Sequence, residues 1–205
     1  LWDAARGTGL LAGTVNLAGC SGAFVSATGL IVTNHHCLFP LLQEHSTPER
    51  DLIRDGFLAR KPGDELSGTT IRVDIPRRFT DVSARVLAAV PADADPLQRL
   101  AAIETRQKAL VAECQQQPDT KCKVAVYDEG LKYTLIESTE LRDVRLVYAP
   151  PRAIGEYGGE VDNWMWPRHT GDFAIARAWA AADGKPADRS ADNIPYRPEF
   201  YFPIA

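Results

Sequence analysis

The chain has 205 residues, of which 45% are hydrophobic and 24% are charged, with 15 glycines and 14 prolines. These proportions exclude a disordered, collagen-like or coiled-coil protein and allow one large domain or two small ones. The formal net charge of -4 argues against a nucleic-acid-binding protein, and no apolar run approaches the roughly 20 residues of a membrane-spanning helix.

The first third of the chain begins with short strands and then becomes helical. β-rich apolar runs separated by glycine-containing turns predict strands at residues 10–17, 22–26 and 30–33. Between residues 38 and 60 the spacing of apolar residues is helical. The segment Ser46–Glu49 predicts the start of a helix there, with Pro48 at the first helical position.

The middle of the chain alternates strands with one longer helix. Apolar alternation predicts further strands at residues 70–75, 82–87, 124–127, 132–136 and 144–148. The segment 95–114 has apolar residues at helical spacing among good helix formers, which predicts an amphipathic helix of about five turns. The chain therefore reads as a β-rich domain with helical insertions, followed by a tail of little periodicity from residue 181 onward.

The four cysteines form two local pairs, Cys20 with Cys37 and Cys114 with Cys122. Neither spacing is C-x-x-C, which disfavours a structural zinc site. Two local disulfides fit this distribution, although four cysteines allow three pairings, and each would stabilise the fold by roughly 2.5–3 kcal/mol. We therefore expect an oxidising compartment, with free thiols in a cytosolic protein as the alternative. Residues 1–6 lack the charged-then-apolar pattern of a signal segment, as expected either for a cytosolic protein or for a mature chain whose signal is not in this sequence.

A strand leads directly into a pair of histidines beside a cysteine, in Thr33-Asn34-His35-His36-Cys37. In serine peptidases of the double-barrel class the general base follows such a strand, and a disulfide holds the turn. The chemistry needs this rigidity, because the imidazole must stay within hydrogen-bond reach of its nucleophile. A surface pair and a metal site are the alternatives. His36, next to the cysteine, is the favoured base, and we expect a structural role for His35.

The segment Gly158–Phe173 concentrates reactive and aromatic side chains. It holds two of the four tryptophans, the only methionine, one of the four histidines, and both Asp162 and Asp172. Such density with little periodicity predicts a functional loop, although an aromatic loop that packs for stability is the alternative. Spacing alone does not choose between Asp162 and Asp172 as the partner of a catalytic histidine.

Together these segments resemble the bacterial dipeptidyl-peptidase 7 and 11 family of serine exopeptidases. The similarity covers nearly the whole chain, including Gly19–Ser26, Gly29–Cys37, His45–Glu49, Asp55–Phe57, Val144–Val147 and Asp162–Phe173. It implies a mainly β, chymotrypsin-like fold, with residues 1–180 as the first barrel of a double-barrel peptidase. Residues 38–60 and 95–114 would be its helical elaborations. Residues 181–205 would cross towards a helical domain and a second barrel.

The resemblance also assigns roles to individual residues. His36 corresponds to the general base and Asp172 to the acid that orients it. Asn163 and Trp164 correspond to residues that line the pocket for the free N-terminus of the substrate. The activity implied is release of dipeptides from oligopeptides by acyl-enzyme hydrolysis, with no cofactor and no metal.

The nucleophile is the part of the triad that the sequence does not supply. Among seven serines, Ser21 in Gly19-Cys20-Ser21-Gly22 comes closest to a nucleophile motif, but its alignment with a barrel strand indicates a structural position. The resemblance implies that the serine lies downstream. The chain is then expected to be an N-terminal portion that is inactive alone, with the remainder of the polypeptide as its partner.

The same resemblance implies a homodimer in the periplasm or cell envelope of a Gram-negative bacterium. Three alternatives to this interpretation stay open from the residues. They are a trypsin-like endopeptidase, a catalytically inert peptide-binding fragment, and a zinc site built from His35, His36 and a cysteine.

Overall fold

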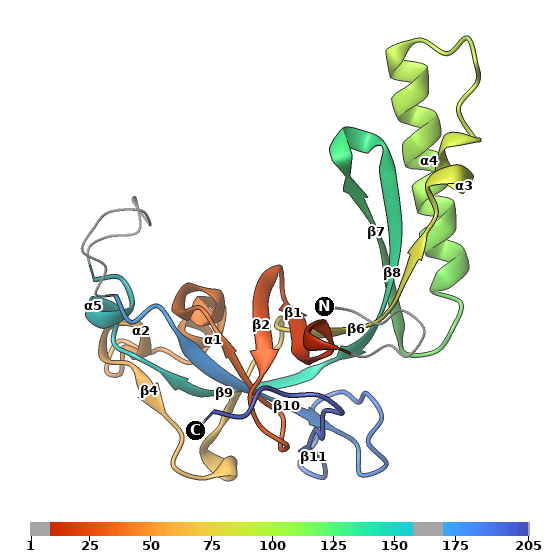
Figure 1. Ribbon diagram of the computed structural model, residues 1–205. Coiled ribbons are helices and arrows are strands. Elements are labelled where there is room, and N and C mark those ends of the chain that lie inside the picture. Colours follow the sequence, from red (N-terminus) through yellow and green to blue (C-terminus); the bar gives the residue numbers. More distant parts are fainter. Residues whose placement is uncertain (1–8, 158–169, 205) are drawn as a thin grey trace. The chain divides into compact units, whose positions relative to one another are not determined.

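The structure is a computed structural model that describes residues 9–157 and 170–204 (Figure 1). The described residues divide into two compact units. The smaller unit contains residues 75–140, and the larger unit contains residues 10–74 and 141–204. The family resemblance implies residues 1–180 as one barrel domain with helical elaborations, whereas the contacts of the structure divide this range between two units.

The larger unit is built on an antiparallel sheet. Hydrogen bonding orders its strands β4-β9-β10-β3-β2-β1, followed by the first residues of β6; in addition, β5 pairs with β9 and β11 pairs with β10. The strands are β1 (Thr14–Leu17), β2 (Cys20–Phe24), β3 (Leu30–Thr33), β4 (Phe57–Leu58), β5 (Leu66–Ser67), β6 (Val73–Asp81), β9 (Asp143–Ala149), β10 (Ala174–Ala180) and β11 (Ile194–Pro195).

Hydrogen bonds do not close this sheet into a barrel within the described residues. The second edge of β1 pairs with Val73 and Asp74 of β6 rather than with β4 at the other end of the order. The strand β4 is only two residues long and is joined through β9 alone. The expected first barrel is therefore present as its strands and their neighbours, but its outline is open.

The core of the larger unit follows the alternation of its strands. Leu17, Phe24 and Ile31 are fully buried on one face. In β10, alternate positions carry alanines with no exposed surface, at residues 174, 176 and 178. Such small side chains let the large apolar groups of neighbouring elements approach the strand closely. β10 lies between β9 and β3 in the middle of the strand order, so its alanines are at the centre of the core.

Short helices cover parts of the larger unit, and α1, α2 and α5 gather around one end of the sheet (Figure 1). They are η1 (Leu10–Gly13), η2 (His35–Leu38), α1 (Phe39–Glu44), α2 (Leu52–Asp55), η3 (Pro62–Asp64) and α5 (Arg152–Gly155). The expected helix start at Ser46–Glu49 is wrong. Asp51 is the N-cap of α2 and accepts from the N–H groups of Ile53 and Arg54 at 3.0 Å each.

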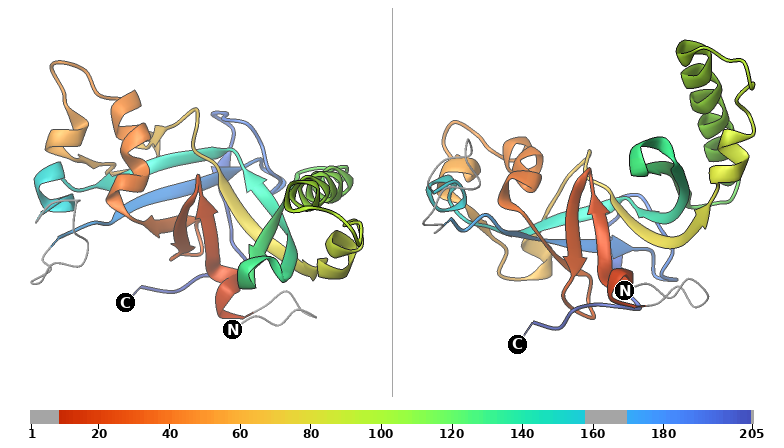
Figure 2. Two further views of the ribbon diagram at one scale, coloured as in Figure 1. Left: turned by 90° about the horizontal axis from the view of Figure 1, so that it is seen from above. Right: turned by 45° about the horizontal axis from the view of Figure 1, so that its top comes forward.

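The smaller unit places the long helix α4 beside a β-hairpin (Figure 2). Its elements are β6, α3 (Ser83–Leu87), α4 (Pro96–Cys114), β7 (Thr120–Tyr127), η4 (Asp128–Gly130) and β8 (Lys132–Leu141). Its core contains Val82, Val86, Leu110, Cys114, Cys122, Tyr133 and Leu135.

Two local features define the secondary structure of the smaller unit. The strand expected at residues 82–87 is instead the helix α3, because Val82 and Val86 are buried at a spacing of one helical turn. The helix α4 begins with a capping box between Asp95 and Gln98. Its last residue, Cys114, is disulfide-bonded to Cys122 of β7.

The tail from residue 181 onward is irregular apart from β11, as the sequence predicts. Two main-chain hydrogen bonds tie it to the sheet, from Tyr196 N to the Ala178 oxygen at 2.9 Å and from Phe202 N to the Phe24 oxygen at 2.8 Å. None of the helices in the described residues combines the length and the apolar character needed to cross a membrane.

Candidate active site

The strand β3 leads into the turn that contains His36, and strand pairing, a Thr33 hydrogen bond and a disulfide fix the position of this turn. β3 lies between β2 and β10, and its last residue, Thr33, donates its hydroxyl to the Ser21 oxygen at 2.8 Å. Asn34 then begins the 3-10 turn η2. The disulfide between Cys37 and Cys20 fastens this turn to the start of β2. The turn is anchored on both sides of His36, whose side chain is 51% exposed.

Asp172 reaches the same place from the neighbouring strand, β10. It lies two residues before β10, and the first residue of β10, Ala174, pairs with Thr33 at the end of β3. Antiparallel pairing brings the start of one strand beside the end of its neighbour. As a result His36 Nδ1 lies 3.2 Å from Asp172 Oδ2, although the two residues are 136 positions apart.

The Asp172 carboxylate collects several donors besides the imidazole. Its Oδ1 accepts from the main-chain N–H groups of His35 at 2.7 Å and His36 at 3.4 Å. Its Oδ2 accepts from Asn34 Nδ2 at 2.9 Å. Asp172 thereby caps the free N–H groups at the start of η2 from a distant part of the chain. These donors hold the carboxylate in one orientation.

This arrangement suits a general base. An ionised Asp172 requires the hydrogen of the imidazole to be on Nδ1, so the lone pair is on Nε2. The Nδ1 contact orients the ring, and the carboxylate would stabilise the imidazolium that forms when Nε2 takes up a proton. Among the described residues, the hydrogen bonding of the His36 ring is to Asp172, and no serine hydroxyl is bonded to it.

His35 occupies the opposite environment. It has no exposed surface, its ring meets that of Phe39 edge-on at 4.8 Å, and it lies so close to Gly155 that a Cβ there would overlap it. Neither ring nitrogen makes a hydrogen bond of good geometry with a described residue. Burial lowers the pKa of His35, against the opposing effects of Asp172, Glu156 and the Pro150 carbonyl. Of the two adjacent histidines, only His36 presents its ring to solvent.

The predicted residues of the substrate-terminus pocket, Asn163 and Trp164, lie outside the described residues, as does Asp162. The flanks of that segment are described. Thr170 donates its hydroxyl to the Gly155 oxygen at 2.6 Å, and Gly171 N donates to the Ile154 oxygen at 2.9 Å. The end of α5 is therefore joined to the residues just before Asp172.

Metal binding finds little support at this site. In the part of the chain that the structure describes, Cys20, His36 and Cys37 are the one group of possible ligands whose atoms all lie within 4.8 Å of each other. Both sulfurs are joined in the disulfide, so neither is available as the thiolate that a metal would require. The alternative of a zinc site at these histidines loses its cysteine ligand.

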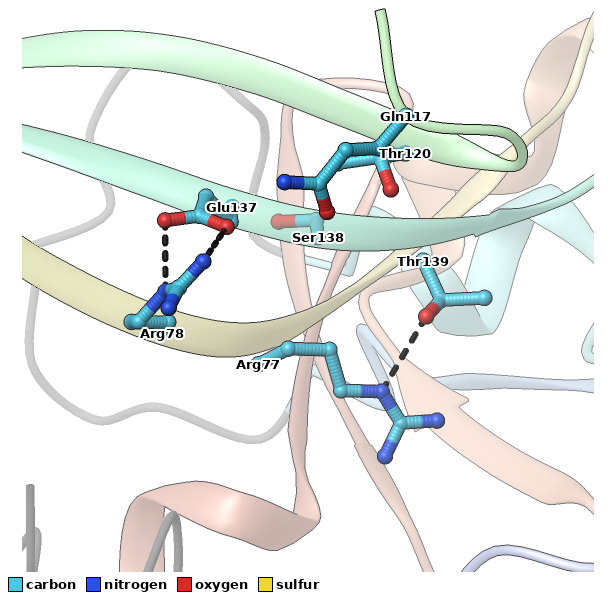
Figure 3. Close-up of a pocket in the computed structure, with 7 residues that line it drawn as sticks. All are labelled: Arg77, Arg78, Gln117, Thr120, Glu137, Ser138 and Thr139. Carbon is cyan, nitrogen blue, oxygen red and sulfur yellow. Dashed lines mark hydrogen bonds and ion pairs between the residues drawn. The ribbon is translucent and has the colours of Figure 1, made fainter. Parts of the chain in front are cut away.

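The smaller unit contains a polar hollow. Its cavity of about 400 Å³ is lined by Arg77, Arg78, Gln117, Thr120, Glu137, Ser138 and Thr139 (Figure 3). Arg78 is paired through two N–H groups with Glu137 at 2.6 and 2.7 Å, and Arg77 donates to the Thr139 hydroxyl at 3.1 Å. Arg78 is therefore neutralised by a carboxylate, whereas the contact of Arg77 is with a neutral hydroxyl, and none of the contacts in the hollow indicates a particular ligand.

Comparison with known proteins identifies the class of this chain. The Peptidase S46 family matches residues 6–205, so the chain belongs to that family. It is 43% identical over 191 residues to the Asp/Glu-specific dipeptidyl-peptidase of Shewanella putrefaciens, covering 93% of this chain and 26% of that protein. It is 38% identical over 187 residues to dipeptidyl-peptidase 7 of Porphyromonas gingivalis, covering 91% of this chain and 26% of that protein.

Comparison with solved structures supports the same family through the fold. The crystal structure of Porphyromonas endodontalis DPP11 in complex with the dipeptide Arg-Asp matches with a TM-score of 0.84 and 34% identity, covering 98% of this chain and 30% of that chain. The predicted fold class, mainly β with helical insertions and chymotrypsin-like, is confirmed. So is the predicted family. The chain spans about a quarter of the length of the curated relatives it matches.

Sequence reasoning overlooked Asn34, whose side chain binds Asp172 twice, through Oδ2 at 2.9 Å and through the main-chain oxygen at 3.3 Å. A signal was available, because asparagine is a preferred residue at the start of a helical turn. Its contact with Asp172 depends on the pairing of β3 with β10, which local patterns do not reveal.

Proposed function

We propose that this chain carries the general base and the orienting acid of a serine-type dipeptidyl-peptidase, which releases dipeptides from the free N-terminus of oligopeptides. The observation that supports this best is the His36–Asp172 contact at 3.2 Å, in a chain that belongs to the Peptidase S46 family. The relatives it matches are dipeptidyl-peptidases by name.

In the proposed reaction, His36 Nε2 takes the proton of the serine hydroxyl as the oxygen attacks the scissile carbonyl. The imidazolium then gives this proton to the leaving amine, and an acyl-enzyme remains. In the second step a water molecule, deprotonated by His36, attacks the ester; the bond from the acyl carbon to the serine oxygen breaks, the imidazolium returns its proton to that oxygen, and the dipeptide leaves with a free carboxyl group. Asp172 stays ionised throughout and stabilises the imidazolium through Nδ1–H.

The serine and the oxyanion hole would be supplied from outside these 205 residues. The chain spans about a quarter of its curated relatives, which leaves room for both in a longer protein. Ser21, the strongest candidate by sequence, is a β2 residue paired with Asn16 of β1, and it has no hydrogen bond with His36. We therefore expect the 205-residue chain to be inactive by itself, since a base without a nucleophile cannot form the acyl-enzyme.

Recognition of the substrate terminus would fall to Asn163 and Trp164. An amide oxygen accepts from an ammonium group, and an indole face attracts it by roughly 0.5–2 kcal/mol. Docking the terminus there would hold the bond after the second residue near His36. We place the enzyme in the periplasm as a homodimer; the disulfides Cys20–Cys37 and Cys114–Cys122 support an oxidising compartment.

The test uses the full-length protein and fluorogenic dipeptide substrates with either a free or an acetylated N-terminus. We expect hydrolysis of the free form only. His36→Ala should lower kcat/KM by at least about 10³-fold. Two controls, His45→Gln and Ser21→Ala, should keep the activity, because His45 binds the Ser67 oxygen at 2.9 Å away from Asp172. Equal hydrolysis of acetylated substrate would indicate an endopeptidase. Full activity in His36→Ala would exclude this site, and loss of activity in Ser21→Ala would place the nucleophile within this chain.

A further inference from the structure

Asn34 is at a helix N-cap, where an asparagine side chain usually accepts a main-chain hydrogen bond, but its side chain does not do so here. Asn34 is the N-cap residue of η2, with φ of -73° and ψ of 151°, yet its side chain caps none of the N–H groups of that turn. Asp172 takes over this capping. The amide of Asn34 points instead to Asp172, 138 positions away, where it meets both the carboxylate and the main-chain oxygen.

The Asp172 carboxylate has a limited number of acceptor positions, and Asn34 occupies one on Oδ2, the oxygen that also contacts the His36 ring. Each carboxylate oxygen has about two lone-pair sites. The two main-chain N–H groups of His35 and His36 occupy Oδ1. The remaining oxygen, Oδ2, is shared between Asn34 Nδ2 at 2.9 Å and His36 Nδ1 at 3.2 Å. The amide therefore holds the same oxygen that orients the imidazole.

We propose that Asn34 is a positioning residue of the reaction, which acts through Asp172 by fixing the oxygen that receives His36 Nδ1–H. This inference rests on the proposed function, since it assigns Asn34 a part in the same proton transfer. Without the amide, the only donor described at Oδ2 is the imidazole, and the carboxylate can turn away from the best geometry for His36. The oxygen also becomes a stronger acceptor, which favours the imidazolium over the neutral base.

Two substitutions separate this role from a merely structural one. Asn34→Ala removes the donor. Asn34→Asp keeps the size but sets a second carboxylate against Asp172, and like charges this close either repel or share a proton. Both act on the ionisation of His36, which a loss of packing would not do. The neighbouring His35, which feels the charges of Asp172, Glu156 and His36, is itself retained in both variants.

The experiment measures kcat and KM of the full-length protein from pH 5 to pH 9. We expect Asn34→Ala to lower kcat about 10-fold with little change in KM, because a hydrogen bond to a charged group is lost and no substrate contact is. Asn34→Asp should lower kcat about 100-fold at neutral pH and move the acid limb of the profile to higher pH. Asn16→Ala is the matched control, since Asn16 Oδ1 accepts from Gly19 N within the β1–β2 turn.

The outcomes distinguish this inference from the proposed function. If both Asn34 variants keep the wild-type kcat and pH profile while His36→Ala is inactive, the inference is overturned and the proposed function stands. If His36→Ala keeps its activity, the proposed function fails.

A second readout then decides on Asn34 alone. Diethyl pyrocarbonate modifies neutral imidazole, so mass spectrometry of His36 modification against pH reports its protonation without any turnover. We expect the midpoint to rise in Asn34→Asp and to stay unchanged in Asn16→Ala. No movement in Asn34→Asp would overturn the inference. Thermal melts of the variants confirm that each is folded, which we expect because Asn34 is exposed.

Discussion

Two aspartates of the larger unit, Asp172 and Asp143, each accept several hydrogen bonds but have opposite surroundings. The Asp143 side chain has no exposed surface and accepts from Arg145 at 2.6 and 2.9 Å and from Asn193 at 2.9 Å. The Asp172 side chain is 24% exposed, and its ionisable partner His36 is 51% exposed. Arg145 stays charged at any pH the protein meets, whereas an imidazole gains and loses its proton near neutrality.

The environment of Asp143 is that of a fixed structural cluster. Arg145 lies opposite Arg177 in the pairing of β9 with β10, which would be repulsive without counter-charges. Asp143 neutralises Arg145, and Glu65 accepts from Arg177 Nε and Trp179 Nε1 at 2.8 Å each. Arg145 also stacks on the Trp179 ring at 3.9 Å.

The comparison teaches that the number of hydrogen bonds does not separate a reactive carboxylate from a structural one. What separates Asp172 from Asp143 is a partner that titrates and is open to solvent.

Exchange of each aspartate for asparagine tests this difference most severely. We expect Asp172→Asn to lower kcat about 10⁴-fold, because an amide no longer stabilises the imidazolium or its tautomer. Asp143→Asn should instead lower the free energy of unfolding by about 3–5 kcal/mol, because the largely buried guanidinium of Arg145 loses its counter-charge. Turnover assays and denaturant titrations of the full-length protein measure both effects. The control is Asp188→Ala, which removes an exposed partner of Arg142. If Asp143→Asn is as stable as this control, the structural role assigned to Asp143 is wrong.

The two disulfides allow the same comparison between a link at the candidate active site and a structural link. We expect their removal to have effects smaller than those of the aspartate substitutions. Loss of Cys20–Cys37, through serine at both positions, should cost about 3 kcal/mol, and loss of Cys114–Cys122 about 2.5 kcal/mol, since the closed loops differ in length. Only the first disulfide holds the turn that carries His36. We expect that variant alone to lose activity, by at least about 10-fold. Equal kcat values for the two double variants would show that the turn keeps its geometry without the disulfide.

The buried His35 should link the stability of the protein to pH, which is the smallest of the expected effects. The pKa of His35 is lowered by burial from its ordinary value of 6.5, so the folded state binds this proton less readily than the unfolded state. The contribution is complete above about pH 6.5 and is lost as pH falls through the lower, folded pKa. His35→Phe should therefore flatten the decrease of Tm between pH 7 and pH 5, relative to wild type. If His45→Gln flattens the Tm profile equally, the pH dependence of Tm does not come from His35.

Much of the architecture could be predicted because it is local. The strands at β3 and β9, the helix α4 and the sharp turn at His35–Cys37 are all visible as periodicity or turn residues. The failures are also local in kind. Residues 82–87 fit either an alternating or a helical pattern, and only the burial of Val82 and Val86 decides for the helix. The helix start at Ser46–Glu49 was displaced because Asp51 supplies the better cap.

By itself, the amino-acid sequence determined the family, the β-rich class, and a histidine turn beside a cysteine, because these depend on residues close together in the chain. The family resemblance already paired Asp172 with His36 and gave His35 a structural role, but only the tertiary structure supplied the 3.2 Å contact, the complete burial of His35 and the bond from Asn34 to the Asp172 carboxylate. The physical reason is that these contacts require β10 to pair with β3. That pairing depends on the order of strands in the sheet, which no local pattern of residues encodes.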